Sequence, residues 1–179
     1  MNRFYTLIFL MMISITSFAQ STGFYDFKVK TLEGGDFDFA SLKGKKVMIV
    51  NTASKCGYTP QYKDLEEVYE KYRGDLVIIG FPANNFMNQE PGSATDIRKF
   101  CTENWGVTFP MMEKISVKGD DMHPLYKWLT SKDKNGVMDS EVKWNFQKYL
   151  IDENGKLVDV IYSKEKPSSE KVIAWISSK

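Results

Sequence analysis

Two short, uninterrupted runs of apolar residues constrain the fold more than any other feature of this sequence. Residues 47–50 and 76–79 contain only Val, Met, Ile and Leu, a pattern typical of strands that are buried on both faces. Between the two runs, apolar side chains recur at helical spacing at Leu65, Val68 and Tyr72. A strand–helix–strand order predicts a parallel, right-handed crossover. The chain is therefore expected to be an α/β protein.

The flanking segments predict the remaining elements. Residues 27–32 and 36–39 surround a Glu-Gly-Gly turn, and residues 148–152 and 156–162 surround Asn154-Gly155, so each pair predicts a hairpin. Helices are expected to begin near Thr59-Pro60, Ser93, Pro124 and Ser168-Ser169. With no internal repeat or linker, the sequence predicts a single domain with a central mixed β-sheet flanked by helices.

The first nineteen residues predict a secretory signal peptide. Arg3 supplies a positive start, residues 4–15 are mostly apolar, and the small residues Ser17 and Ala19 stand at the two positions that a signal peptidase reads. We expect cleavage between Ala19 and Gln20, which leaves residues 20–179 as the folded domain of an exported, periplasmic protein. An uncleaved membrane anchor is the alternative, but the apolar run is shorter than the roughly 20 residues that a span needs.

Composition excludes several classes of partner. Lys and Arg number 24 against 23 Asp and Glu, so the charge gives no reason to expect nucleic acid binding. A single histidine, His123, and two cysteines make a metal site improbable, and no cofactor is expected. Two cysteines in an exported chain are also compatible with one structural disulfide.

Cys56 is the most informative position. It follows the first buried strand and precedes the helix expected near Pro60, so its thiol faces the positive end of the helix dipole and free backbone N–H groups, with Lys55 beside it. These features favour the thiolate, which is the nucleophile. Thr59 stands where a dithiol enzyme has its second cysteine, so Cys-x-x-Cys chemistry is absent. A single active thiol suits attack on a peroxide O–O bond, which gives a sulfenic acid.

Three blocks, in family order, resemble the glutathione peroxidase family. Residues 51–59 (NTASKCGYT) are similar to its active-site signature, residues 80–92 (GFPANNFMNQEPG) to its second signature, and residues 143–146 (KWNF) to its third. The resemblance runs from about Tyr25 to the C-terminus. It implies a thioredoxin-like fold and a thiol peroxidase that reduces hydrogen peroxide and organic hydroperoxides.

The resemblance also implies an active-site quartet of Cys56, Gln89, Trp144 and Asn145. Cys56 would be the peroxidatic residue. The two side-chain amides and the indole are N–H donors. Donors directed at sulfur favour its charged form and can stabilise the departing oxygen.

A resolving role for Cys101 is implied in the same way, because residues 100–110 are similar to the segment that holds the resolving cysteine in the thioredoxin-dependent branch. Ala83 and Asn85 stand where many members have Cys and Gln, so we expect local packing changes there and no second candidate for resolution. A disulfide with Cys56 requires Cα atoms within about 7 Å, so the helix must partly unwind if the thiols start farther apart. The alternative is a buried helical cysteine that fills core space.

The connection over residues 130–143 is short and polar, unlike the insertion of the tetrameric members, so a monomer is expected. Glutathione-binding residues are not recognisable, and a thioredoxin-like protein is the expected reductant, ahead of a low-molecular-weight thiol. Two alternatives remain open. One is a peroxide-sensing redox relay that uses the same cysteines. The other is a structural protein with a permanent Cys56–Cys101 disulfide, which leaves the blocks around Gln89 and Trp144 unexplained.

Overall fold

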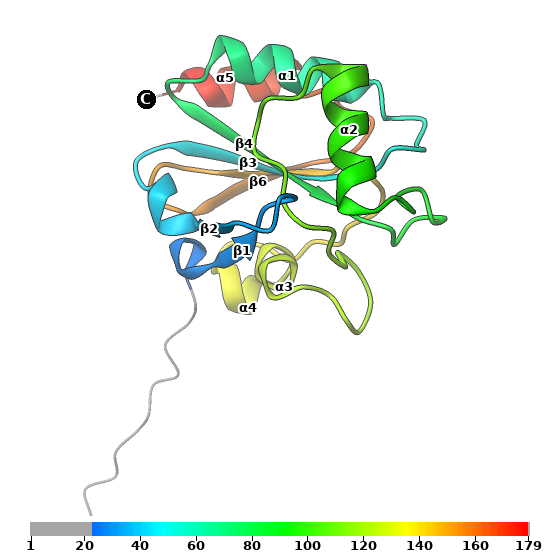
Figure 1. The fold of residues 1–179 in the computed structure, drawn as a ribbon. Helices are drawn as coiled ribbons and strands as arrows, with labels where there is room; N and C mark the ends of the chain where they lie inside the picture. Colours follow the sequence, from blue (N-terminus) through cyan, green and yellow to red (C-terminus); the bar gives the residue numbers. More distant parts are fainter. Residues whose placement is uncertain (1–22, 179) are drawn as a thin grey trace, which may run out of the picture.

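A four-stranded sheet forms the centre of the computed structural model, which describes residues 23–178. The strand order is β4-β3-β5-β6, with β3 parallel to β4 and antiparallel to β5, so the predicted mixed sheet is confirmed (Figure 1). Its strands are β3 (Lys46–Thr52), β4 (Leu76–Pro82), β5 (Lys148–Ile151) and β6 (Leu157–Ile161). The predicted signal peptide lies outside the described residues.

Helices cover both faces of this sheet (Figure 1). The face that carries α1 (Gln61–Lys71), α2 (Ala94–Trp105) and α5 (Glu170–Ser177) lies opposite the face that carries α3 (Pro124–Thr130) and α4 (Lys132–Asn135). Smaller elements complete the second layer, namely η1 (Phe24–Asp26), β1 (Lys28–Lys30), β2 (Asp36–Asp38) and η2 (Phe39–Leu42). None of the helices within residues 23–178 is long and apolar enough to cross a membrane.

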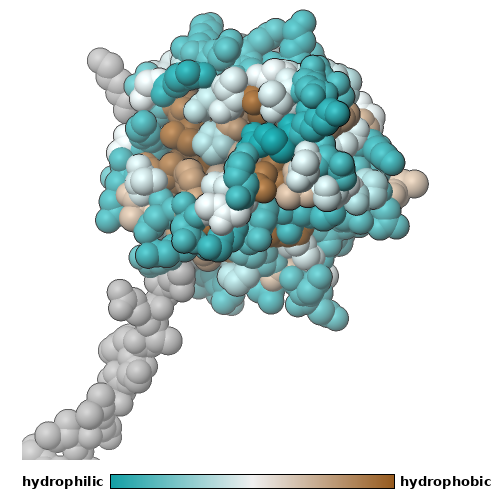
Figure 2. Space-filling view, viewed as in Figure 1, coloured by the Kyte–Doolittle hydropathy of each residue, from teal (hydrophilic) through white to brown (hydrophobic). Residues whose placement is uncertain are grey.

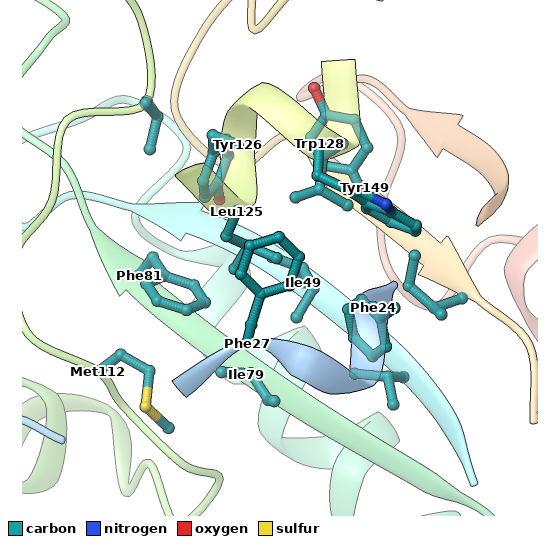
Figure 3. Packing of buried hydrophobic residues seen from close by; sticks show 14 of the residues in the cluster. Phe24, Phe27, Ile49, Ile79, Phe81, Met112, Leu125, Tyr126, Trp128 and Tyr149 are labelled. Carbon is teal, nitrogen blue, oxygen red and sulfur yellow. The ribbon is translucent and has the colours of Figure 1, made fainter. Parts of the chain in front are cut away.

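The central strand β3 is buried along its whole length, as its apolar run predicts. Val47 and Ile49 pack into one hydrophobic cluster, and Met48 and Val50 pack into another. The first cluster is rich in aromatic side chains, which come from residues 24–39, from the middle of the chain and from β5 (Figure 3). The molecular surface in view is mostly hydrophilic, with hydrophobic side chains confined to small patches (Figure 2).

The predicted elements are largely confirmed. Ser93 starts α2 in a capping box with Asp96, and the Ser169 hydroxyl accepts a hydrogen bond from Val172 N at the start of α5. β1 and β2 form an antiparallel hairpin, as do β5 and β6. β4 extends beyond the predicted apolar run of residues 76–79 and continues through Pro82. Proline is tolerated there because β4 is an edge strand.

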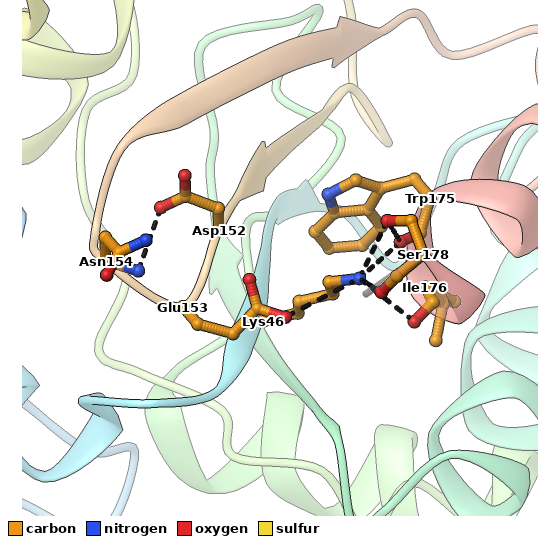
Figure 4. Close-up of polar contacts among 7 residues, drawn as sticks. All are labelled: Lys46, Asp152, Glu153, Asn154, Trp175, Ile176 and Ser178. Atoms are coloured by element: carbon orange, nitrogen blue, oxygen red, sulfur yellow. Dashed lines mark hydrogen bonds and ion pairs between the residues drawn. The ribbon is translucent and has the colours of Figure 1, made fainter.

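A buried lysine fastens the last helix to the sheet. Lys46, the first residue of β3, is only 4% exposed, and its ammonium donates to the carbonyl oxygens of Trp175 (2.7 Å) and Ile176 (3.2 Å) (Figure 4). It also donates to the Ser178 hydroxyl at 3.0 Å and lies 3.6 Å from a carboxylate oxygen of Glu153. The carboxyl end of a helix carries partial negative charge, so a cation stabilises it there.

We expect Lys46→Met to lower the free energy of unfolding by about 2 kcal/mol, because it leaves the last carbonyl groups of α5 without their donor. Urea denaturation of the purified protein measures this difference. Lys45→Met is the matched control, since Lys45 is exposed and a substitution at such a surface position changes stability by about 0.5 kcal/mol or less. Equal midpoints for the two variants would contradict the anchoring role of Lys46.

Candidate active site

Cys56 lies in the loop between β3 and α1, at the carboxyl end of the central strand. Its side chain is 8% exposed, and the backbone N–H of Tyr58 donates a hydrogen bond to Cys56 Sγ at 3.4 Å. The prediction that a backbone N–H group faces this thiol is therefore confirmed. A hydrogen bond donated to sulfur favours the thiolate, the form that attacks.

Thr59 forms hydrogen bonds within this loop and does not cap the helix. The helix expected to begin near Thr59-Pro60 is α1, which begins at Gln61, and no side chain caps it at Pro60. The Thr59 hydroxyl donates to Ala53 O at 2.9 Å and accepts from Cys56 N at 3.0 Å. Since these bonds fix both sides of the turn, Thr59 determines the backbone conformation at Cys56.

The loop after β4 brings Gln89 to the Cys56 loop. The backbone N–H of Lys55 donates to Gln89 O at 2.9 Å, so Gln89 lies next to the residue that precedes Cys56. Met87 and Asn88, just before it, both have φ of 52°, a left-handed conformation that is uncommon for residues other than glycine. Such backbone strain persists where surrounding contacts impose it, often at functional sites.

The loop before β5 contributes Trp144 and Asn145. The Asn145 side chain is fully buried, and its Nδ2 donates to Gln89 Oε1 at 2.9 Å. Asn51 Nδ2 donates to Trp144 O at 3.1 Å, and Phe146, at φ 63°, donates its N–H to Asn51 O at 2.6 Å. The structure thus gathers the three predicted loops at the end of β3 and joins two quartet members directly.

The hydrogen bonding of the quartet differs from a simple set of donors to sulfur. Within residues 23–178, Tyr58 N is the one group hydrogen-bonded to Cys56 Sγ. Gln89 Oε1 is occupied by Asn145, which leaves Gln89 Nε2 as the donor of that side chain. The roles of Gln89, Trp144 and Asn145 toward sulfur remain predictions.

Cys101 has a different environment from Cys56. It lies on α2 with no exposed surface, and burial raises the pKa of its thiol to about 11. The negative charge of Glu90 raises this pKa further, whereas the neighbouring Tyr62 hydroxyl and Arg98 lower it. Both cysteines are free thiols, so the structure describes the reduced protein. At neutral pH, Cys101 is therefore a protonated, shielded thiol.

Sequence reasoning assigned no role to three residues that shape the site: Asn51, Glu90 and Phe146. Asn51 bonds to the third loop, and Phe146 supplies its left-handed turn, as described above. Glu90 is 1% exposed and accepts a hydrogen bond from the Ser54 hydroxyl at 2.7 Å. The position of Asn51 directly after an apolar strand could have indicated its role at the site. The burial of the Glu90 carboxylate has no local sequence pattern that could have predicted it.

Ala83 and Asn85, the two departures from the family pattern, contact residues outside the quartet. Ala83 is fully buried, and its N–H donates to Thr52 O at 3.0 Å. The Asn85 amide donates to the Ser116 hydroxyl and accepts from Val117 N, each at 2.9 Å. Asn85 therefore holds a neighbouring loop and does not enter the site.

An open pocket of about 440 Å³ adjoins the Cys56 loop. Its lining residues are Tyr58, Lys143, Trp144, Tyr162, Ser163 and Lys164. Tyr58, whose N–H contacts the sulfur, and Trp144, a quartet member, place this pocket next to the site, although Cys56 itself does not line it. In the described part of the chain, no group of three or more His, Cys, Asp or Glu residues could hold a metal ion.

Lys148, the first residue of β5, is a second buried lysine, close to the start of α1. Its ammonium donates to Gln61 Oε1 and to Glu165 O, both at 2.6 Å, and Gln61 Nε2 donates to Ser163 O at 2.6 Å. This network ties the first residue of α1 to the segment that lines the pocket. Burial lowers the pKa of Lys148 to about 7.

Comparisons with known proteins agree with the predicted family. The family model described as Glutathione peroxidase matches residues 24–130. Glutathione peroxidase-like peroxiredoxin 2 of Saccharomyces cerevisiae is 52% identical over 151 residues, which cover 83% of this chain and 93% of that protein. The glutathione peroxidase homolog BsaA of Bacillus subtilis is 50% identical over 135 residues, which cover 75% and 84% of the two chains.

Solved structures agree as well. The crystal structure of Trgpx in its apo form superposes with a TM-score of 0.68 at 42% identity, covering 88% of this chain and 97% of that one. A thioredoxin family protein of Chlorobium tepidum, a thiol:disulfide interchange protein, gives a TM-score of 0.59 at 21% identity and so shows the fold alone. The expected thioredoxin-like fold is confirmed.

We expect Lys148→Met to remove a pH dependence of stability. Because the pKa of Lys148 is about 7 in the folded protein and about 10.4 when unfolded, the unfolded chain binds more protons between these values. The stability of the wild type relative to the variant should therefore rise with pH above about 7, by at most about 1.4 kcal/mol per pH unit. Urea denaturation at several pH values measures this difference in stability. Lys164→Met is the control, because Lys164 is exposed. A pH-independent difference would contradict the prediction.

Proposed function

The chain belongs to the glutathione peroxidase family, and we propose that it is a thiol peroxidase that reduces hydrogen peroxide and organic hydroperoxides through Cys56. The Cys56 thiolate attacks one peroxide oxygen, which leaves the sulfur as a sulfenic acid and releases water or an alcohol. The observation that carries the proposal is the Tyr58 N–H bonded to Cys56 Sγ at 3.4 Å. The Gln89–Asn145 amide pair beside that loop supports it.

Gln89, Trp144 and Asn145 act in this proposal as donors that stabilise developing negative charge. The bond from Asn145 to Gln89 Oε1 supports this role for Gln89, since it holds the amide in one orientation and does not use its Nε2 donor group. Preorganised donors of this kind stabilise charge without reorganising during the reaction.

Cys101 then resolves the sulfenic acid. Its thiol condenses with Cys56 to form an intramolecular disulfide, which a thioredoxin-like protein reduces. Cys101 is buried within α2, and if its Cα lies more than about 7 Å from that of Cys56, the helix must open locally before the sulfurs meet. Low-molecular-weight thiols are the alternative reductant, and peroxide consumption with each reducing system separates the two. Sustained turnover also separates a peroxidase from a redox relay.

We further propose that the protein is an exported monomer. The short connection between α3 and β5, which contains only the single turn of α4, supports the monomer. The apolar start and the small residues before Ala19 support export. A light-scattering mass near four times that of the chain would refute the monomer, and a mature N-terminus other than Gln20 would refute the cleavage site.

Cys56→Ser should abolish peroxidase turnover, because a serine hydroxyl supplies almost no nucleophilic anion at neutral pH. Gln89→Ala should retain the fold and slow thiol oxidation by roughly 30–150-fold, the loss of about 2–3 kcal/mol of charge-directed hydrogen bonding. Stopped-flow oxidation by hydrogen peroxide measures both rates. Substantial turnover in the serine variant would contradict the role of Cys56.

Cys101→Ser should still react once with peroxide and then stop at the sulfenic acid, which a dimedone-type reagent traps. Excess peroxide should convert it to sulfinic acid, while the wild type loses both free thiols and gains a disulfide mass. Thioredoxin-dependent turnover should fall sharply, because the disulfide substrate is lost. A variant that keeps full turnover would make Cys101 a packing residue.

A further inference from the structure

Glu90 is a buried carboxyl group with one unused oxygen. The residue is 1% exposed, and its Oε1 accepts a hydrogen bond from the Ser54 hydroxyl at 2.7 Å. Its Oε2 is buried without a hydrogen-bond partner. A buried polar atom that lacks a partner costs free energy, so its presence calls for an explanation.

Glu90 lies between the two elements that carry the cysteines. A cavity of about 240 Å³ separates the Cys56 loop from α2, and Glu90 is part of its wall. The other lining residues are Ser54, Lys55, Pro91, Gly92, Asp96, Ile97 and Phe100. Lys55 directly precedes Cys56, and Phe100 directly precedes Cys101. Ile97 in this wall lies one turn before Cys101 on the same face of α2, so the cavity lies between the Cys56 loop and the helix face that carries Cys101.

Resolution by Cys101 needs a base. With a pKa of about 11, only about one molecule in 10⁴ carries the Cys101 thiolate at pH 7. Burial raises the pKa of the adjacent Tyr62 well above its usual range, so its phenol is not a base at neutral pH, and Arg98 is a cation. Among the described residues, Glu90 is the one carboxylate whose charge acts on Cys101.

We propose that Glu90 is the general base, and then the general acid, for disulfide formation between Cys101 and the Cys56 sulfenic acid. Glu90 accepts the proton of the Cys101 thiol as that sulfur attacks Cys56. The S–S bond forms, the S–O bond of Cys56 breaks, and the departing hydroxide takes the proton from Glu90 and leaves as water. The Cys101 sulfur is oxidised and the Cys56 sulfur reduced, so no further reactant is needed. This inference rests on the proposed resolving role of Cys101.

The protonation behaviour of Glu90 agrees with this role. Burial raises its pKa, and the hydrogen bond from Ser54 and the charge of Lys114 limit the rise. A carboxyl group with a raised pKa exchanges protons more effectively near neutral pH. The ionisable or charged groups around it are Lys55 from the Cys56 loop, Tyr62 from α1, Asp96, Arg98 and Cys101 from α2, and Lys114 from the segment beside β4.

Glu90→Gln tests the proposal, because the amide keeps an oxygen that accepts the Ser54 bond but exchanges no proton. After one equivalent of hydrogen peroxide, stopped-flow fluorescence and rapid-quench mass spectrometry follow sulfenic acid formation and then disulfide formation. We expect the first rate within twofold of wild type, and the second at least tenfold slower at pH 7. Glu103→Gln is the matched control, since it removes an exposed carboxylate from α2, the helix that carries Cys101; both of its rates should equal those of the wild type.

A disulfide-formation rate in Glu90→Gln within twofold of wild type would overturn this inference and leave the peroxidase proposal intact. Failure of the wild type to form any disulfide would instead overturn the role of Cys101, and the role of Glu90 with it. If Glu90→Gln does not fold, the pH profile of the wild type decides. With Glu90 as base, the rate of disulfide formation should stop rising with pH well below pH 11. A tenfold increase in this rate per pH unit up to about pH 11 would refute the role of Glu90.

Discussion

The hydrogen bonds at the carboxyl end of β3 hold the candidate site together. β3 is buried on both faces and flanked by β4 and β5, so only its end is available for polar chemistry. There, Thr52 O accepts the N–H of Ala83 at 3.0 Å, and Asn51 O accepts that of Phe146 at 2.6 Å. These two bonds dock the loop that follows β4 and the loop that precedes β5. Residues far apart in the chain thus converge beside Cys56 without any movement of the sheet.

The environments of the two cysteines divide the chemistry between them. Cys56 is a loop residue that is 8% exposed, with a backbone N–H at its sulfur. Cys101 is enclosed by a helix and kept protonated by burial. Because the thiolate is the reactive form, Cys101 does not compete for peroxide in the closed protein. In the proposed cycle, Cys101 therefore reacts after Cys56, as the resolving thiol.

Sequence reasoning predicted those parts of the fold that depend on local pattern. The apolar runs predicted β3 and β4 because complete burial leaves an uninterrupted hydrophobic signature, and Ser93 predicted the start of α2 because capping is a local interaction. The resemblance to the family placed the site residues in three loops. The bond between Asn145 and Gln89 was not foreseen, because a pairing between side chains 56 residues apart depends on tertiary approach. The lack of a hydrogen-bond partner at Glu90 Oε2 was not predicted for the same reason.

The contact of Lys46 with the end of α5 has a consequence for folding. Lys46 and Ser178 are 132 residues apart, and β5, one of the two neighbours of β3, also comes from the last part of the chain. Such non-local pairing slows folding, because loop closure costs entropy before the contacts form. Until the C-terminal segment is present, β3 has one open edge, and an open apolar edge is a template for pairing with other chains. An incomplete chain that lacks residues 148–178 is therefore the form of this protein most prone to aggregate.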